Sequence, residues 1–143
     1  MRLSTKGRYA LRAMVDLAAH CEQAPVPRKD IADRQDISPH YLEQLFAKLR
    51  DAGLIEAVRG PGGGYRLARR PDEITAGEVV RAVEDVLSPV ACLIADPDLQ
   101  CERAPSCPTQ RVWKELGERA SQYLDSVTVG DLCEDAREPA ETK

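Results

Sequence analysis

A helix with clear signals at both ends, followed at once by a glycine-rich segment, most constrains the fold of this chain. Ser38 is a favourable N-cap, and Pro39 suits the first helical position, where its missing N–H costs nothing. Gly53 provides a C-terminal stop. Between these ends, apolar side chains recur at steps of three and four residues. They predict one buried stripe made of Leu42, Leu45, Phe46 and Leu49.

The segment after this helix has the pattern of a β-hairpin. Residues 54–58 and 65–67 have strand character, and Gly60-Pro61-Gly62-Gly63-Gly64 separates them. Four glycines in five residues permit positive φ and a close approach of the backbone to a partner. Arg59 and Arg66 flank the loop and make it basic. A long helix followed by such a hairpin predicts a winged helix-turn-helix.

The rest of the chain reads as helices. A first helix is expected at residues 5–21 and a short second one at 28–34, where Ile31 and Ala32 point inward. The capping box Thr75-Ala76-Gly77-Glu78 starts a helix expected at 76–87. A helix from about 108 to 127 has heptad-like apolar spacing, which favours a dimer helix over packing on its own domain. The apolar positions are Ala10, Met14, Leu17, Ala18 and Cys21 on the first helix, and Trp113, Leu116, Ala120, Tyr123 and Val127 on the long one.

The predicted fold class is therefore mainly α: a winged helix-turn-helix with a two-stranded β-wing, plus a long C-terminal dimerisation helix. Thr128-Val129-Gly130-Asp131 is expected to cap one last short helix. The predicted organisation is 1–75 for the winged helix-turn-helix domain, 76–91 for a connecting helix, 92–107 for a cysteine loop, 108–134 for the dimerisation and cap helices, and 135–143 for a polar, disordered tail.

The distribution of charge favours a nucleic-acid partner although the net charge is -4. Residues 1–70 carry 13 Lys/Arg and 8 Asp/Glu, a net of +5, whereas residues 71–143 carry 7 and 16, a net of -9. Such asymmetry indicates one face for a polyanion and another turned away from it. No apolar run approaches the roughly 20 residues of a membrane span, and no signal peptide is evident. The expected location is the cytoplasm, beside the nucleoid, with no membrane partner.

The unburied face of the helix after Ser38 supplies candidates for reading double-stranded DNA. Gln44 can pair with adenine and Glu43 can accept a hydrogen bond from cytosine N4 in the major groove. Because phosphates repel a carboxylate, Glu43 either reads a cytosine or penalises sites that lack one; the alternative is a solvated surface glutamate. The candidates on this helix are Ser38, His40, Tyr41, Glu43, Gln44 and Lys48.

Further cations are expected to bind the DNA backbone or the minor groove. Arg59 on the wing suits a narrow minor groove, where the negative potential is concentrated. The phosphate-contact candidates are Arg2, Lys6, Arg8, Arg12, Arg28 and Lys29.

Three cysteines fall in one Asp- and Pro-rich loop and predict a metal or redox site. Cys92, Cys101 and Cys107 are separated by eight and five residues. Zinc knuckles favour shorter gaps, whereas iron–sulfur clusters accept varied thiolate spacings. A thiol switch would need two of the three and no metal. The spacing alone is compatible with an iron–sulfur cluster, a zinc site or a thiol switch. Cys21 and Cys133 lie in helical patterns and are expected to be inert.

Three segments resemble the iron–sulfur cluster regulator family, the IscR-type repressors. They are residues 1–10 (MRLSTKGRYA), 38–45 (SPHYLEQL) and 58–65 (VRGPGGGY). The resemblance continues through Gly77-Glu78-Val79-Val80 and the cysteine loop to Trp113 and residues 129–132. It implies a homodimeric bacterial transcription factor whose cluster selects its promoters. It places Tyr41, Glu43, Gln44 and Arg59 at DNA contacts, Glu43 at a residue that discriminates two classes of site, and Cys92, Cys101 and Cys107 at the cysteine ligands.

The chain departs from that family pattern around the cluster. The family's 2Fe–2S members usually have five residues between the first two cysteines, and a histidine where this chain has Gln110. The longer gap is closer to relatives with 4Fe–4S clusters, some of which use a carboxylate where this chain has Arg8. The resemblance favours 2Fe–2S, with 4Fe–4S as the alternative, and leaves the fourth ligand open.

The functional hypothesis is a non-enzymatic DNA-binding repressor that senses cluster status, iron, or oxidative or nitrosative stress. The alternatives are a winged-helix repressor with a zinc or thiol switch, and a thiol redox enzyme or metal carrier. The enzyme is disfavoured because the sequence has no Cys-x-x-Cys pair and no recognisable catalytic set.

Overall fold

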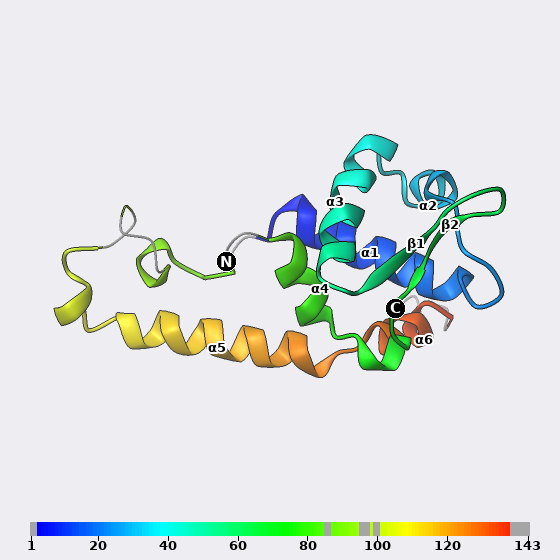
Figure 1. Cartoon of the computed structure of the whole chain (residues 1–143). Coiled ribbons are helices and arrows are strands. Elements are labelled where there is room, and N and C mark those ends of the chain that lie inside the picture. Colours follow the sequence, from blue (N-terminus) through cyan, green and yellow to red (C-terminus); the bar gives the residue numbers. More distant parts are fainter. Residues whose placement is uncertain (1–2, 85–86, 95–97, 99–100, 138–143) are drawn as a thin grey trace.

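The computed structural model describes residues 3–84, 87–94, 98 and 101–137. A helical head carries a two-stranded wing, and a long helix extends away from it (Figure 1). Its elements are α1 (Thr5–His20), α2 (Arg28–Gln35), α3 (Pro39–Asp51), β1 (Ile55–Val58), β2 (Gly64–Leu67), α4 (Ala76–Val83), α5 (Gln110–Ser126), α6 (Val129–Arg137), and the short 3-10 turns η1 (Pro71–Glu73), η2 (Ala91–Leu93) and η4 (Ala104–Ser106). The predicted winged helix-turn-helix with C-terminal helices is confirmed.

One hydrophobic core joins α1, α2 and α3 to α4 and α6, which contribute Val79, Val83, Val129 and Cys133. The predicted stripe of α3 is buried throughout, as are Ile31 and Ala32 of α2. On α1 Ala10, Met14 and Leu17 are buried, whereas Ala18 and Cys21 are only half-buried. Ser38 caps α3 by accepting a hydrogen bond from the Tyr41 N–H at 3.1 Å, as its sequence position predicts.

The wing consists of the antiparallel strands β1 and β2. The loop before α2 adds one further β-bridge to β2. Glu56 faces Arg66 across the pair, and Val58 faces Gly64. Val26, from the loop before α2, exchanges two 2.8 Å backbone hydrogen bonds with Tyr65. A Cβ on Gly64 would overlap the Val26 carbonyl, so glycine is required at this close approach. The wing is thereby fixed to the helix-turn-helix.

Two capping boxes begin α4 and α6 side by side. Thr75 and Glu78 exchange side chain–backbone hydrogen bonds of 3.0 and 3.1 Å, and Thr128 and Asp131 exchange two of 3.0 Å. Both predicted caps are confirmed. The two N-cap threonines face each other in an antiparallel bridge, in which the Ala76 N–H donates to the Val127 carbonyl at 2.8 Å. This bridge explains why α5 ends at Ser126 rather than at the predicted Val127, which is extended.

The prediction that the connecting helix reaches residue 87 is wrong. Helix α4 ends at Val83, and Glu84 is extended. The Glu84 carboxylate accepts hydrogen bonds from the Ser4 N–H at 3.1 Å, the Ser4 hydroxyl at 2.6 Å and the Gly7 N–H at 3.0 Å. An anionic acceptor at the exposed N–H groups that begin α1 offsets the helical hydrogen bonds that α4 gives up.

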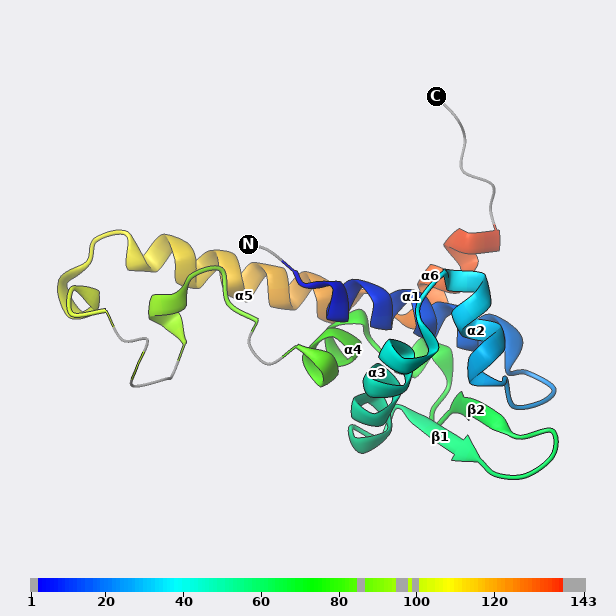
Figure 2. The same cartoon turned by 90° about the horizontal axis from the view of Figure 1, so that it is seen from above.

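The C-terminal helices also differ from expectation at their ends. Helix α6 continues through Arg137, three residues into the segment expected as a tail, and residues 138–143 lie outside the described residues. Helix α5 projects from the head, with its C-terminal end at the head and its N-terminal end remote from it (Figure 2), and none of its residues is buried.

An ion pair with a buried carboxylate joins α1 to α2. The Asp16 carboxylate, 2% exposed, accepts hydrogen bonds from Arg34 Nη2 at 2.7 Å, Arg34 Nε at 3.0 Å and Gln35 Nε2 at 2.9 Å. Burial by itself raises the pKa of Asp16, but the hydrogen bonds and the charge of Arg34 outweigh it and hold the pKa below its ordinary value. The pair therefore stabilises the folded state while Asp16 is ionised.

We expect Asp16→Asn to lower the free energy of unfolding by about 1–3 kcal/mol at pH 7, because the Arg34 guanidinium loses its anionic partner. The contribution of a carboxylate with a lowered folded pKa is complete above its ordinary value of 3.8 and is lost as the pH falls through the folded pKa. The difference between wild type and variant should therefore shrink below about pH 4. Urea unfolding between pH 3 and 7 measures it, with exposed Asp33→Asn as the matched control; a pH-independent difference would contradict the ion-pair explanation.

Candidate DNA interface and cysteine loop

The first two turns of α3 present most of the predicted DNA-reading side chains together. His40, Glu43 and Gln44 are exposed, and Tyr41 is half-buried. The Gln44 amide nitrogen lies 3.2 Å from His40 Nε2, so the two side chains are neighbours one helical turn apart. Ser38 is exposed at the N-cap, and its hydroxyl is occupied by capping the helix. The N-terminal end of α3 thus offers a polar surface of the kind that enters a major groove.

Tyr41 connects this surface to α1. Its hydroxyl lies 3.1 Å from the Thr5 hydroxyl, and its ring packs edge-on against Tyr9 with centroids 6.0 Å apart. Arg12 lies over the Tyr9 ring at 5.3 Å and donates to the Gln35 side chain and carbonyl. The guanidinium of Arg12, predicted to bind phosphate, is thus engaged within the head.

Glu43 pairs with a cation from α2. Arg28 Nη1 lies 3.3 Å from Glu43 Oε1. The sequence predicts separate roles for the two residues: a phosphate contact for Arg28 and a base contact for Glu43. The ion pair between them is not readable from the sequence, since the residues are fifteen positions apart on different helices.

The wing carries Arg59 at its exposed tip. Gly60 and Gly62 have φ of 97° and 75°, and the Gly63 N–H donates to the Gly60 carbonyl at 2.9 Å, which closes the turn. Arg66, in contrast, is tied to Glu56 across the strands by a 2.9 Å ion pair. Arg59 is thus an exposed cation at the tip of the wing, whereas Arg66 is engaged within the hairpin.

The remaining predicted phosphate contacts are spread over the starts of α1 and α2 and along α3. Arg8 and Lys29 are exposed, Lys6 and Lys48 are half-buried, and Arg2 lies outside the described residues.

The cysteine loop lies between α4 and α5, at the end of the molecule remote from the wing (Figure 1). Cys92 falls in η2, Cys101 is exposed before η4, and Cys107 precedes α5. Among the described residues, no three Cys, His, Asp or Glu side chains lie close enough to hold a metal ion. Of the other two cysteines, Cys133 is buried in α6, which raises the pKa of its thiol, and Cys21 follows α1.

The donor chemistry of the loop nevertheless fits an iron–sulfur cluster. The Thr109 hydroxyl, 3.1 Å from Cys107 Sγ, and the backbone N–H groups that begin α5 lower the pKa of the Cys107 thiol. Thiolate is the form that binds iron. Three thiols on a chain fixed by helices at both ends form a suitable set, although this conformation does not bring them together.

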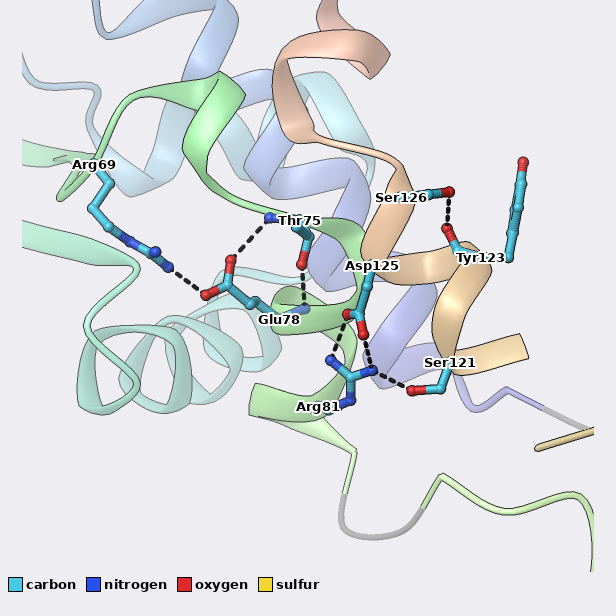
Figure 3. Close-up of polar contacts among 8 residues, drawn as sticks. All are labelled: Arg69, Thr75, Glu78, Arg81, Ser121, Tyr123, Asp125 and Ser126. Carbon is cyan, nitrogen blue, oxygen red and sulfur yellow. Dashed lines mark hydrogen bonds and ion pairs between the residues drawn. The ribbon is translucent and has the colours of Figure 1, made fainter. Parts of the chain in front are cut away.

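Sequence reasoning missed the polar contacts that join α4 to its neighbours (Figure 3). Arg81 binds both carboxylate oxygens of Asp125 on α5 at 2.7 and 2.9 Å. The Glu78 carboxylate accepts a 2.8 Å hydrogen bond from Arg69, just after the wing. The Thr75 backbone N–H and Arg69 together lower the pKa of Glu78, and Arg81 lowers that of Asp125. No local pattern marks these contacts, because each joins different elements.

A groove-reading helix, a basic wing and a helix-turn-helix core define a winged helix-turn-helix DNA-binding protein. Residues 3–135 match the Rrf2 family, described as an iron-dependent transcriptional regulator, and the chain belongs to this family. It is therefore a transcriptional regulator rather than an enzyme.

Individual relatives agree with this assignment. The chain is 47% identical over 135 residues to the HTH-type transcriptional regulator IscR of Aliivibrio salmonicida, covering 94% of this chain and 79% of that relative. The structure of T. potens IscR is similar with a TM-score of 0.79 and 40% identity, covering 100% of this chain and 93% of that one. CymR, the global cysteine regulator of B. subtilis, has a TM-score of 0.76 and 40% identity, covering 94% and 97%. The relation to IscR suggests an iron–sulfur cluster.

In the part of the chain that the structure describes, no helix combines the length and apolarity needed to cross a membrane.

We expect Arg59→Ala to weaken operator binding and to reduce the slope of log affinity against log salt by about one, because one cation leaves the DNA backbone or minor groove. Fluorescence anisotropy over a salt series measures both quantities. Arg66→Ala is the matched control, since its guanidinium is already paired with Glu56. Equal losses in the two variants would contradict a specific role for Arg59.

Proposed function

We propose that this protein is a homodimeric repressor, present in the cytoplasm beside the nucleoid, that senses iron–sulfur cluster status. Its signal is iron supply or oxidative or nitrosative stress, and its targets are genes for cluster assembly or stress defence. Cys92, Cys101 and Cys107 would hold the cluster; Ser38, His40, Tyr41, Glu43, Gln44, Lys48, Arg59, Arg2, Lys6 and Arg28 would contact DNA. The observation that carries the proposal is a three-thiol loop, with a lowered Cys107 pKa, joined by α4 and α5 to a DNA-reading head.

The cluster, when bound, supplies a redox-sensitive and iron-dependent crosslink among the three cysteines. The protein's own contacts then relate the loop to the head. The loop departs just after Glu84, which holds the start of α1, and Thr5 in that first turn contacts Tyr41. Ordering of the loop would shift the position of α1 and hence of α3. A coupling of about 1–3 kcal/mol, or 5–150-fold in affinity, is typical of such regulation.

Family membership favours a 2Fe–2S cluster over 4Fe–4S, whereas the eight-residue gap and Gln110 favour the latter. The identity of the fourth ligand depends on which of the two cluster types is bound. A winged-helix repressor with a zinc or thiol switch is the alternative function, because the same three thiols serve either chemistry.

The dimer is proposed from α5. Val112, Trp113, Leu116 and Tyr123 are 53%, 38%, 43% and 68% exposed on a helix with no buried described residue. A large apolar face of this kind marks an interaction surface. A second copy is the occupant we propose, because winged-helix regulators read two half-sites with a twofold pair of heads.

For the cluster, we expect protein purified without air to be brown and to contain iron and sulfide, and Cys101→Ala to lose the visible absorbance. Cys21→Ala, outside the loop, should keep it. Mössbauer spectra of the wild type identify the cluster type. Operator affinity of the iron-replete and stripped forms should differ by at least about fivefold for one class of site. Equal affinities of the two forms for every operator would contradict the sensing proposal, and a colourless zinc protein would support the alternative.

For the dimer, we expect Leu116→Glu to dissociate the protein into monomers, because burying a new carboxylate at an apolar interface is unfavourable. Analytical ultracentrifugation measures the assembly, and operator affinity should fall with it. Gln122→Glu adds the same charge to the same helix away from the apolar stripe and should leave the dimer intact. If the Leu116→Glu variant is still a dimer, α5 is not the dimer interface.

A further inference from the structure

The ion pair between Arg28 and Glu43 lies where the two helices of the helix-turn-helix meet. Arg28 is the first residue of α2, and Glu43 lies in the second turn of α3. Their side chains are 36% and 58% exposed, and the N–O distance is 3.3 Å. The pair is therefore at the surface of the head, on the helix face that carries His40 and Gln44.

The attraction between Arg28 and Glu43 contributes more in the DNA complex than in the free protein. A lone carboxylate on a groove-inserting face is repelled by the phosphates on both sides. A guanidinium 3.3 Å away offsets that repulsion, and the attraction within the pair strengthens as the interface excludes water. The first helix of a helix-turn-helix crosses the DNA backbone, so Arg28 enters the same environment as Glu43.

The geometry also leaves Glu43 able to read a base while it stays paired. A carboxylate accepts through two oxygens with about four lone-pair sites. Arg28 engages Oε1, and a base-edge donor such as cytosine N4 can bind at Oε2. This single N–O contact restricts the rotamers of the Glu43 side chain.

We infer that Arg28 is a positioning residue for sequence discrimination: it acts through Glu43, neutralising its charge and orienting it toward the base edge. This differs from a phosphate contact, which strengthens binding to all sequences alike. The inference rests on the proposed role of Glu43 in reading DNA.

A double-mutant cycle on the full-length dimer tests it. The probes are duplexes that wild type selects from a randomised pool, together with all single base-pair substitutions of the selected sequence. Dissociation constants are measured for wild type, Arg28→Ala, Glu43→Gln and the double variant, after circular dichroism has established that each is folded. Lys29→Ala is the matched control, an exposed cation next in sequence on the same helix.

We expect Arg28→Ala to reduce discrimination at one base pair by about tenfold when Glu43 is present, and to leave discrimination unchanged in the Glu43→Gln background. Arg28→Lys should keep the salt dependence but lose part of the discrimination, because a flexible ammonium orients the carboxylate less than a planar guanidinium does. Lys29→Ala should weaken every duplex equally in both backgrounds.

If Arg28→Ala weakens binding to all duplexes by the same factor, whether residue 43 is Glu or Gln, Arg28 is a phosphate contact only. In that case the inference is wrong. If Glu43→Gln itself leaves discrimination unchanged, the proposed role of Glu43 fails and the inference fails with it. The iron dependence of binding is measured separately and is unaffected by either result.

Discussion

The carboxylate of Glu84 joins the start of α1 to the end of α4. It accepts three hydrogen bonds at the start of α1, from a position eighty residues later in the chain. The N–H groups at that helix end lack intrahelical partners and carry the positive end of the helix dipole, so an anionic acceptor stabilises them strongly. Gly7 makes room for it, because a Cβ there would lie 2.8 Å from the Glu84 oxygen. The start of α1, the end of α4 and the departure of the cysteine loop are thus one junction.

Both ends of the cysteine loop lead, through short contacts, to α3 and the wing, the elements that we propose bind DNA. From Glu84 the contacts pass to the first turn of α1 and through Thr5 to Tyr41 on α3. From α5, Asp125 binds Arg81, and one turn earlier on α4 Glu78 binds Arg69 beside the wing. Contiguity alone does not transmit a signal; an element with two arrangements must lie on the route. In this structure Glu84 caps α1 instead of continuing α4.

The parts of the fold that the sequence predicted are those specified locally. Ser38, Pro39 and Gly53 bound α3 without reference to the rest of the chain, and the two threonine capping boxes behave in the same way. The early end of α4 was mispredicted because its cause, the Glu84 contact with α1, is tertiary. The same holds for the candidate site: the exposed face of α3 follows from helical periodicity, but the pairing of Arg28 with Glu43 requires the packing of α2 on α3. The three cysteines were found by their proximity in sequence, whereas their gathering round a metal depends on a conformation that spacing does not specify.

A chain with a net charge of -4 binds a polyanion more readily if most of its acidic groups lie away from the contact. The excess acid follows residue 70, and one part of it lies in the cysteine loop and the adjoining half of α5, which extend to the side remote from the wing (Figures 1 and 2). At physiological salt, screening over about 8 Å removes most of the repulsion from such distant charges. This separation does not reduce the repulsion between Glu43 and the phosphates, because Glu43 lies on the face of α3 that we propose reads DNA. Its neutralisation by Arg28 is therefore what lets an acidic side chain take part in reading DNA without opposing every contact around it.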